Sequence, residues 1–265
     1  MKNKHCLFFI HGFCSGPEDW KNQFVFFKDK FRVEIPLLRG HDNKNSNNLP
    51  ISIEQLSLDC AEFIIKNNIQ NIVFIGHSMG TRIAVYLANL LKNRTLGLVL
   101  VDGSKFCDQN NYSEIINKFE NSIKENKYED ILSEMFSEMI FSSKFDNLKE
   151  FVIKRALSIK FEISKTLRRN AIWFDGHCLE PILKSLNVPI LLMQSTTINK
   201  FGKRMFIDTG NLSDIPYIEF VKENCANSFD KIIFQKTGHY ISIEKSEDFN
   251  KNLLNWLLNK IFKDK

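Results

Sequence analysis

The sequence feature that most constrains the fold is the pentapeptide Gly-His-Ser-Met-Gly at positions 76–80. It directly follows a β-branched apolar run, 72–75, and precedes a segment with the pattern of a helix, 81–91. An apolar run that is closed by Gly-x-Ser-x-Gly and followed by a helix predicts a strand, a very tight turn and a helix. Ser78 is therefore expected at the tip of that turn.

Steric crowding in the turn explains why both ends of the pentapeptide are glycines. A sharp strand-to-helix turn strains its central residue and crowds the positions two before and two after it, which favours residues without a Cβ. Gly76 and Gly80 occupy these positions. The turn exposes the Ser78 hydroxyl and directs the Met79 N–H, at the helix N-terminus, toward the place where an oxyanion would form. The pentapeptide thus predicts a nucleophile beside an electrophilic donor.

Composition excludes several other classes of function. The chain has 265 residues, 43% hydrophobic and 25% charged, which is ordinary for a globular protein with a sizeable core. Its net charge of +5 is spread without a basic run, which argues against a nucleic-acid partner. No apolar run approaches the roughly 20 residues of a membrane span, and the run 6–10 is too short for a signal peptide. We therefore expect a cytoplasmic protein, whose oligomeric state the sequence does not indicate.

The six cysteines lack metal-binding spacing, and we expect buried free thiols and no metal site at Cys6, Cys14, Cys60, Cys107, Cys178 and Cys225.

Short apolar strands alternate with helical patterns in both end regions of the chain. Strands are expected at 6–10, 31–36, 72–75, 96–103, 188–194 and 231–234. Helices are expected between and after them, at 18–30, 52–66, 81–91, 217–224 and 247–261. This alternation predicts an α/β fold with a mostly parallel sheet and helices on both faces. The pattern from 105 to 185 is purely helical, so we expect a cap of helices inserted into a core formed by 1–104 and 186–265.

A serine nucleophile needs a base, and the base needs a group that orients it. Among the six histidines, His239 follows a predicted strand at the carboxyl edge of the sheet, the edge at which Ser78 also emerges. Position and chemistry together favour His239 as the base. His11 lies at the same edge with the neighbours of a loop residue, while His41 and His77 flank turns and are expected to hold them by hydrogen bonds.

The chain contains four motifs in this order: His11-Gly12-Phe13, Arg39-Gly40-His41, Gly76-His77-Ser78-Met79-Gly80 and Gly238-His239. In these motifs it resembles the α/β-hydrolase superfamily, in its bacterial esterase-like branch with a helical lid. The resemblance spans nearly the whole chain. It implies the α/β-hydrolase fold, Ser78 as nucleophile, His239 as general base and a lid at 105–185. It also implies an oxyanion hole formed by the backbone N–H groups of Phe13 and Met79. The two strands that precede the first parallel strand in many relatives are expected to be absent.

The sequence departs from the superfamily pattern at the acid of the triad. Most relatives carry an aspartate after the strand equivalent to 189–193, but the turn 194–199 contains no carboxylate here. Asp102 ends the strand that follows the Ser78 unit, a position that some superfamily lipases use. Asp208 or Asp214, in the long loop before the next strand, are alternatives, and a dyad without an acid is a third. We take Asp102 as the candidate acid.

The predicted cap carries methionine and aromatic side chains that would form an apolar acyl pocket if some of them face Ser78: Met135, Phe136, Met139, Phe141, Trp173 and Phe174. The alternative is that they belong to the core, which is the commoner role of such a stripe at helical spacing. We therefore predict a serine hydrolase that cleaves a small-to-medium, partly apolar carboxylic ester through an acyl-enzyme intermediate, without a metal or organic cofactor. Carbon–carbon bond hydrolases, thioesterases and lactonases use the same triad and stay open as alternatives. A ligand-binding protein of the same fold with little turnover is the alternative of a different class.

Overall fold

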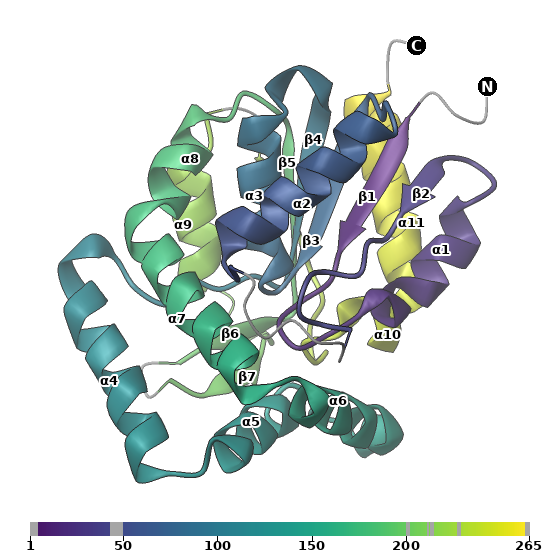
Figure 1. Cartoon of the computed structure of the whole chain (residues 1–265). Coiled ribbons are helices and arrows are strands. Elements are labelled where there is room, and N and C mark those ends of the chain that lie inside the picture. The colour runs from purple at the N-terminus through teal and green to yellow at the C-terminus, as the bar shows by residue number, and fades with distance from the viewer. Residues whose placement is uncertain are drawn as a thin grey trace.

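The computed structural model describes residues 5–42, 50–199, 202–210, 212, 215–226 and 229–262. Its centre is a six-stranded sheet with the order β2-β1-β3-β4-β5-β8, in which every neighbouring pair is parallel (Figure 1). The strands of this sheet are β1 (Cys6–Ile10), β2 (Arg32–Glu34), β3 (Ile72–His77), β4 (Thr95–Val101), β5 (Ile190–Gln194) and β8 (Phe229–Ile233). The predicted parallel sheet is therefore confirmed.

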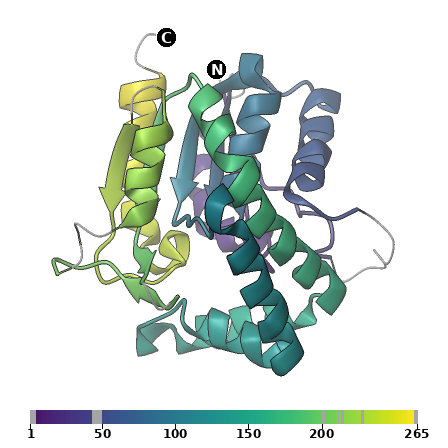
Figure 2. The same ribbon diagram turned by 90° about the vertical axis from the view of Figure 1, so that its left-hand side faces the viewer.

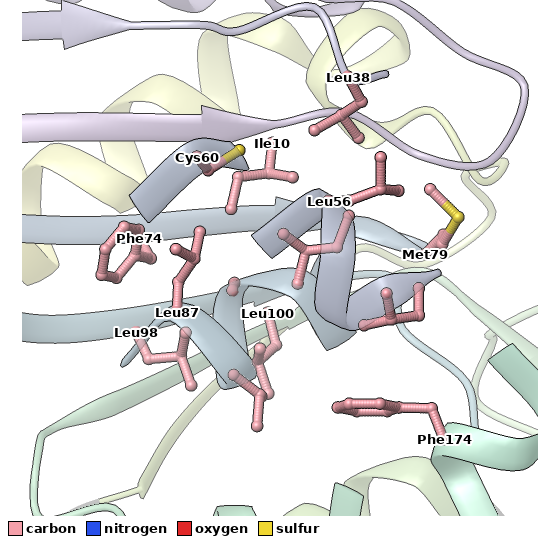
Figure 3. Packing of buried hydrophobic residues seen from close by; sticks show 14 of the residues in the cluster. Ile10, Leu38, Leu56, Cys60, Phe74, Met79, Leu87, Leu98, Leu100 and Phe174 are labelled. Atoms are coloured by element: carbon pink, nitrogen blue, oxygen red, sulfur yellow. The ribbon is translucent and has the colours of Figure 1, made fainter. Parts of the chain in front are cut away.

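Helices cover both faces of the sheet because its central strands are apolar on both sides. Phe8 and Phe74 belong to one buried cluster, whereas their neighbours Phe9 and Ile75 belong to a second. The first cluster packs beneath α2 (Ile53–Lys66), α3 (Gly80–Leu90), α8 (Leu179–Ser185) and α9 (Pro216–Asn224). Figure 3 shows part of this cluster, with Leu56 of α2 and Leu87 of α3 packed near Phe74 of β3. The second packs beneath α1 (Lys21–Phe27), α10 (Ile241–Glu244) and α11 (Ser246–Trp256).

The segment between β4 and β5 is helical in the structure. Before α8 it contains α4 (Tyr112–Glu125), α5 (Tyr128–Ser137), α6 (Asp146–Ser158) and α7 (Phe161–His177). Figures 1 and 2 show α5 and α6 beyond the end of the sheet to which the strand arrows point, while α7 runs back toward the sheet domain and contacts α2. The helical segment therefore lies over the carboxyl edge of the strands, where the predicted site residues emerge.

The structure also contains short 3₁₀ helices and a π-helical turn: η1 (Pro17–Trp20), η2 (Lys92–Arg94), η3 (Gln109–Asn111), η4 (Ser143–Phe145) and η5 (Leu257–Ile261). The predicted helix 18–30 is thus split into η1 and the short α1. Ser52 caps α2, since its hydroxyl accepts a hydrogen bond from the Gln55 N–H at 3.0 Å. Among the described helices, none combines the length and the apolar character that crossing a bilayer requires.

A two-stranded antiparallel sheet of β6 (Thr196–Ile198) and β7 (Arg204–Phe206) was not predicted, and neither was the short helix α10. The sequence indicated only a polar stretch here, because three-residue strands are too short for an alternating pattern to show. Hydrogen bonds of the flanking residues hold the pair in place. The Ile207 N–H donates to the Ser195 carbonyl oxygen at 2.8 Å, and the Lys236 N–H donates to the Ile207 carbonyl oxygen at 2.8 Å. This small sheet lies directly beside the candidate site.

All six cysteines are free thiols, and four of them are buried as predicted: Cys6, Cys14, Cys60 and Cys107. The predicted burial is wrong for Cys178 and Cys225, which are partly exposed because they lie at the ends of helices, directly after α7 and α9.

Candidate active site

The turn between β3 and α3 holds Ser78 in a left-handed backbone conformation, with φ of 55°. A non-glycine residue in this region is strained and persists only when its surroundings hold it. The Ser78 N–H donates to the Val101 carbonyl oxygen on β4 at 2.9 Å. The Thr81 N–H and hydroxyl donate to the Ser78 carbonyl oxygen at 3.1 and 2.7 Å. The strained serine is thus held from the neighbouring strand and from the first turn of α3.

Glycines permit this turn because other backbone segments approach it closely. A Cβ on Gly76 would lie 2.2 Å from the Gly80 carbonyl oxygen, and one on Gly80 would lie 2.6 Å from the Ile10 carbonyl oxygen. Gly12, in the loop after β1, has the same property, since a Cβ there would lie 3.1 Å from the Ser78 Cβ. The close approach at Gly12 brings the loop after β1 against the serine.

His239 lies in the loop after β8 and is only 1% exposed. Its Nδ1 is 2.5 Å from Oδ2 of Asp102, a fully buried residue that directly follows β4. The His239 N–H donates to the Met139 carbonyl oxygen at 2.8 Å, and the His77 Nε2 donates to the His239 carbonyl oxygen at 2.9 Å. Hydrogen bonds therefore fix His239 at its Nδ1, its backbone N–H and its carbonyl oxygen. The acceptor of the backbone N–H, Met139, belongs to the helical segment after β4.

The carboxylate of Asp102 is surrounded by donors from the turn after β5. Its Oδ1 accepts hydrogen bonds from the N–H groups of Ser195 at 2.7 Å and Thr196 at 2.8 Å. Its Oδ2 accepts from the Thr196 hydroxyl at 2.5 Å and lies 3.5 Å from Nη1 of Arg204. The turn that lacks a carboxylate of its own thus holds one supplied by the neighbouring strand.

These contacts determine the charge states of the pair. Burial alone would raise the pKa of the Asp102 carboxyl, but the hydrogen bond and charge of His239 and the charge of Arg204 hold that pKa below its ordinary value. Burial, and then the charge of Arg204, lower the pKa of His239 to about 4, although Asp102 opposes the shift. His239 is therefore a neutral imidazole at neutral pH and can accept a proton.

Two backbone N–H groups beside Ser78 are not used by the fold. Within the part of the chain that the structure describes, the N–H groups of Phe13 and Met79 donate to no protein acceptor. Ser78, Phe13 and Met79 line one cavity of about 90 Å³, and Ser78, Phe13 and His239 line a smaller one beside it. Two free donors of this kind, next to a serine hydroxyl, are what a tetrahedral oxyanion needs.

The alternative acids are not brought to His239 by any contact in the described residues. The Asp208 carboxylate accepts a hydrogen bond from the Gly210 N–H at 2.9 Å, within its own loop. Asp214 lies outside the described residues. Of the three aspartates that the sequence left open, the structure brings Asp102 to the imidazole.

Two further histidines hold loops by hydrogen bonds, as the sequence indicated. The Leu38 N–H donates to Nε2 of His11 at 3.1 Å, and Nδ1 of His41 donates to the Arg39 carbonyl oxygen at 3.1 Å. In the described ranges, no group of three histidine, cysteine, aspartate or glutamate side chains is placed to hold a metal ion.

Of the six apolar residues predicted for an acyl pocket, three line the cavities beside Ser78: Met135, Phe136 and Met139. Phe174 packs in the first core cluster (Figure 3). Phe141 and Trp173 lie at the surface, 40% and 38% exposed. The apolar wall beside Ser78 is therefore supplied by the end of α5 and the residues directly after it.

Sequence reasoning missed three arginines that line the 90 Å³ cavity: Arg82, Arg168 and Arg204. Arg82 has a signal in retrospect, because it follows Ser78 by four residues and so lies one helical turn after it. Arg204 has none, because its position depends on the unpredicted pairing of β6 with β7.

Comparison with known proteins identifies a family that this chain matches. A family model described as "Alpha/beta hydrolase family" matches residues 7–249. "Putative esterase/lipase 2" of Mycoplasma pneumoniae is 35% identical over 109 residues, which are 38% of this chain and 38% of that protein. "Putative esterase/lipase 3" of Mycoplasma genitalium is 29% identical over 192 residues, which are 72% of this chain and 67% of that protein.

Solved structures resemble the whole chain. A hydrolase from Oleispira antarctica has a TM-score of 0.75 at 14% identity, covering 97% of this chain and 92% of its own. An esterase from Exiguobacterium antarcticum has a TM-score of 0.73 at 16% identity, with the same two coverages. Likeness at this level of identity shows the fold.

Proposed function

The chain belongs to the alpha/beta hydrolase family, and from this premise we propose that it is a serine hydrolase that cleaves a carboxylic ester through an acyl-enzyme intermediate. The observation that carries the proposal is the 2.5 Å contact between Asp102 Oδ2 and His239 Nδ1, next to a serine in a strained turn. A buried carboxylate that accepts the Nδ1 proton leaves Nε2 as the nitrogen that can take the Ser78 proton.

In the proposed reaction, the Ser78 hydroxyl oxygen attacks the ester carbonyl carbon while His239 Nε2 takes its proton. The negative charge that develops on the carbonyl oxygen is stabilised by the N–H groups of Phe13 and Met79. The tetrahedral intermediate collapses, the alcohol leaves with the proton from His239, and Ser78 carries the acyl group. His239 then activates a water molecule, which releases the acid and restores the serine.

We also propose that residues 105–185 act as the cap of a core formed by 1–104 and 186–265. A cavity of about 360 Å³ lies between α4, α5 and α7 and has a mainly apolar lining that includes Phe119 and Leu132. It shares Phe13 and Met135 with the 90 Å³ cavity beside Ser78. This continuity supports a small-to-medium substrate with an apolar part, because cavities of this size accept such groups.

The proposal is tested with a series of p-nitrophenyl esters from acetate to dodecanoate, with a thioester and a lactone measured beside them. We expect hydrolysis by the wild type that Ser78→Ala abolishes, with the highest kcat/KM at short or medium acyl chains. A thioester or lactone that is cleaved much faster than every ester would reassign the substrate class. Absence of hydrolysis above the Ser78→Ala background, together with no labelling of Ser78 by a fluorophosphonate, would favour the ligand-binding alternative.

A further inference from the structure

Three arginines line the cavity beside Ser78, although ester hydrolysis as such requires none of them. Arg82 belongs to α3, Arg168 to α7 and Arg204 to β7. Guanidinium groups are rarely buried unless a carboxylate or another acceptor compensates their charge. Each of the three therefore needs its acceptor identified.

Two of these arginines have their acceptors within the protein. Arg82 makes a bidentate pair with Asp175, at 2.8 and 2.6 Å, and also donates to the Ser104 carbonyl oxygen at 2.7 Å. Arg204 donates to the Thr196 hydroxyl at 2.5 Å and lies 3.5 Å from Asp102. Both guanidinium groups are therefore compensated by buried carboxylates of the fold.

Arg168 differs from the other two. In the described ranges of the chain its guanidinium makes no hydrogen bond or ion pair with a protein acceptor. Its guanidinium carbon lies 3.9 Å from the centroid of the Phe106 ring, and that of Arg82 lies 4.6 Å from the same centroid. Stacking on an aromatic ring orients a guanidinium but leaves its in-plane N–H donors free.

Arg168 remains a cation in this position. Burial and the nearby charge of Arg82 lower its pKa to about 10, although the charge of Asp175, the partner of Arg82, opposes the shift. Arg168 is therefore still protonated at neutral pH. One carboxylate, Glu138, also lines the cavity, and its charge raises the pKa of Arg204. The free guanidinium therefore lies in a cavity shared with Ser78, without a carboxylate of its own.

We propose that Arg168 binds a carboxylate of the substrate, so that the ester cleaved at Ser78 is an anionic one. This inference rests on the proposed serine hydrolase function and refines its substrate class. Arg168 lines both the 90 Å³ cavity and the 360 Å³ cavity, so the carboxylate would lie between the scissile ester and an apolar part. A guanidinium binds a carboxylate through two parallel hydrogen bonds, which fixes the orientation of the substrate.

A carboxylate fits this position better than a phosphate. Only one guanidinium is available, because Arg82 and Arg204 are already paired, and the Glu138 carboxylate opposes the second charge of a dianion. The cavity therefore matches a monoanion.

The kinetic test compares p-nitrophenyl monoesters of succinate and glutarate with the same esters whose carboxylate is replaced by a primary amide. Hydrolysis by Ser78→Ala is subtracted as the background. We expect the wild type to show a kcat/KM for the carboxylate ester roughly ten- to hundredfold above that for the amide. Arg168→Gln should bring this ratio close to one, and Arg168→Lys should give an intermediate ratio because the charge remains and the planar fork is lost.

A matched control is the next residue of the same helix. Arg169 pairs with Glu120 and its side chain is 39% exposed, so Arg169→Gln removes an arginine from α7 without changing the cavity. We expect its kcat/KM ratio to equal that of the wild type. The p-nitrophenyl ester of 3-phosphonopropanoate tests a dianion, and a kcat/KM above that of the succinate ester would overturn the assignment to a carboxylate.

A binding experiment separates this inference from the proposed function. Monomethyl glutarate is titrated into Ser78→Ala by calorimetry, with and without Arg168→Gln, and we expect the Kd to rise at least about tenfold in the double variant. Ester hydrolysis without a carboxylate preference would overturn the inference and leave the serine hydrolase standing. Binding that depends on Arg168, in a protein that hydrolyses no ester, would overturn the function and support the anion site. A Kd that is equal in both variants would overturn the site.

Discussion

Replacement of Asp102 by asparagine tests the proposed triad sharply, because existing hydrogen bonds determine how the new amide must lie. Oδ1 accepts from the N–H groups of Ser195 and Thr196, so the amide oxygen takes this place. The amide nitrogen then replaces Oδ2 and faces Nδ1 of His239. Since this nitrogen donates, Nδ1 must be unprotonated and the imidazole proton moves to Nε2. The nitrogen that should take the Ser78 proton is then already occupied.

The size of the expected loss in kcat follows from this change of tautomer. The wrong tautomer in a serine triad lowers kcat by roughly 10⁴-fold, which is about 5.5 kcal/mol of transition-state stabilisation. The two backbone hydrogen bonds to the side chain survive in Asp102→Asn, so the variant is expected to fold. Its far-UV circular dichroism should match that of the wild type.

The assay is kcat for p-nitrophenyl butanoate, with Ser78→Ala as the lower limit. Asp208→Asn is the matched control, because Asp208 was the alternative acid and its carboxylate is bonded to Gly210 in its own loop. We expect Asp208→Asn to keep the wild-type kcat. If Asp102→Asn kept more than about a tenth of kcat, the tautomer argument would be refuted, and a large loss in Asp208→Asn would move the acid to that residue.

The remaining predictions concern stability. The ion pair of Asp175 with Arg82 is buried, with side chains 0% and 2% exposed, so Asp175→Asn should cost about 3–5 kcal/mol and lower Tm by roughly 5–10 °C; an unchanged Tm in a thermal melt would contradict this. Burial lowers the pKa of His77 to about 3 and that of His239 to about 4, so both stay neutral in the fold while the unfolded chain protonates below about pH 6.5. As the pH is lowered below 6.5, the free energy of unfolding should therefore decrease by up to roughly 1.4 kcal/mol per pH unit for each of these two histidines. A urea midpoint that is constant from about pH 7 to 5 would disprove this. Gly76→Ala should fail to fold or lose activity, because its Cβ would lie 2.2 Å from a carbonyl oxygen four residues later; soluble expression with wild-type turnover would argue against the turn as described.

The main sheet could be predicted because each buried parallel strand is a local apolar run, as at β1 and β3. The β6 and β7 pair could not, since three residues carry no periodic signal and their pairing depends on bonds such as that of the Ile207 N–H with the Ser195 carbonyl oxygen. The same reason hid Arg204, whose contact with Asp102 exists only because β7 pairs with β6.

The local chemistry around Ser78 is a property of the sequence itself, because the glycines that permit its turn lie within two residues of it. The acid is different: Asp102 and His239 are 137 residues apart, and only the strand order β4-β5-β8 in the sheet brings one aspartate to the imidazole. Arg168 and Arg169 are alike in the sequence, and only the way α7 packs decides which guanidinium faces the cavity and which pairs at the surface. Residue type and spacing thus determine what a segment can do, while long-range packing determines which chemically equivalent residue does it.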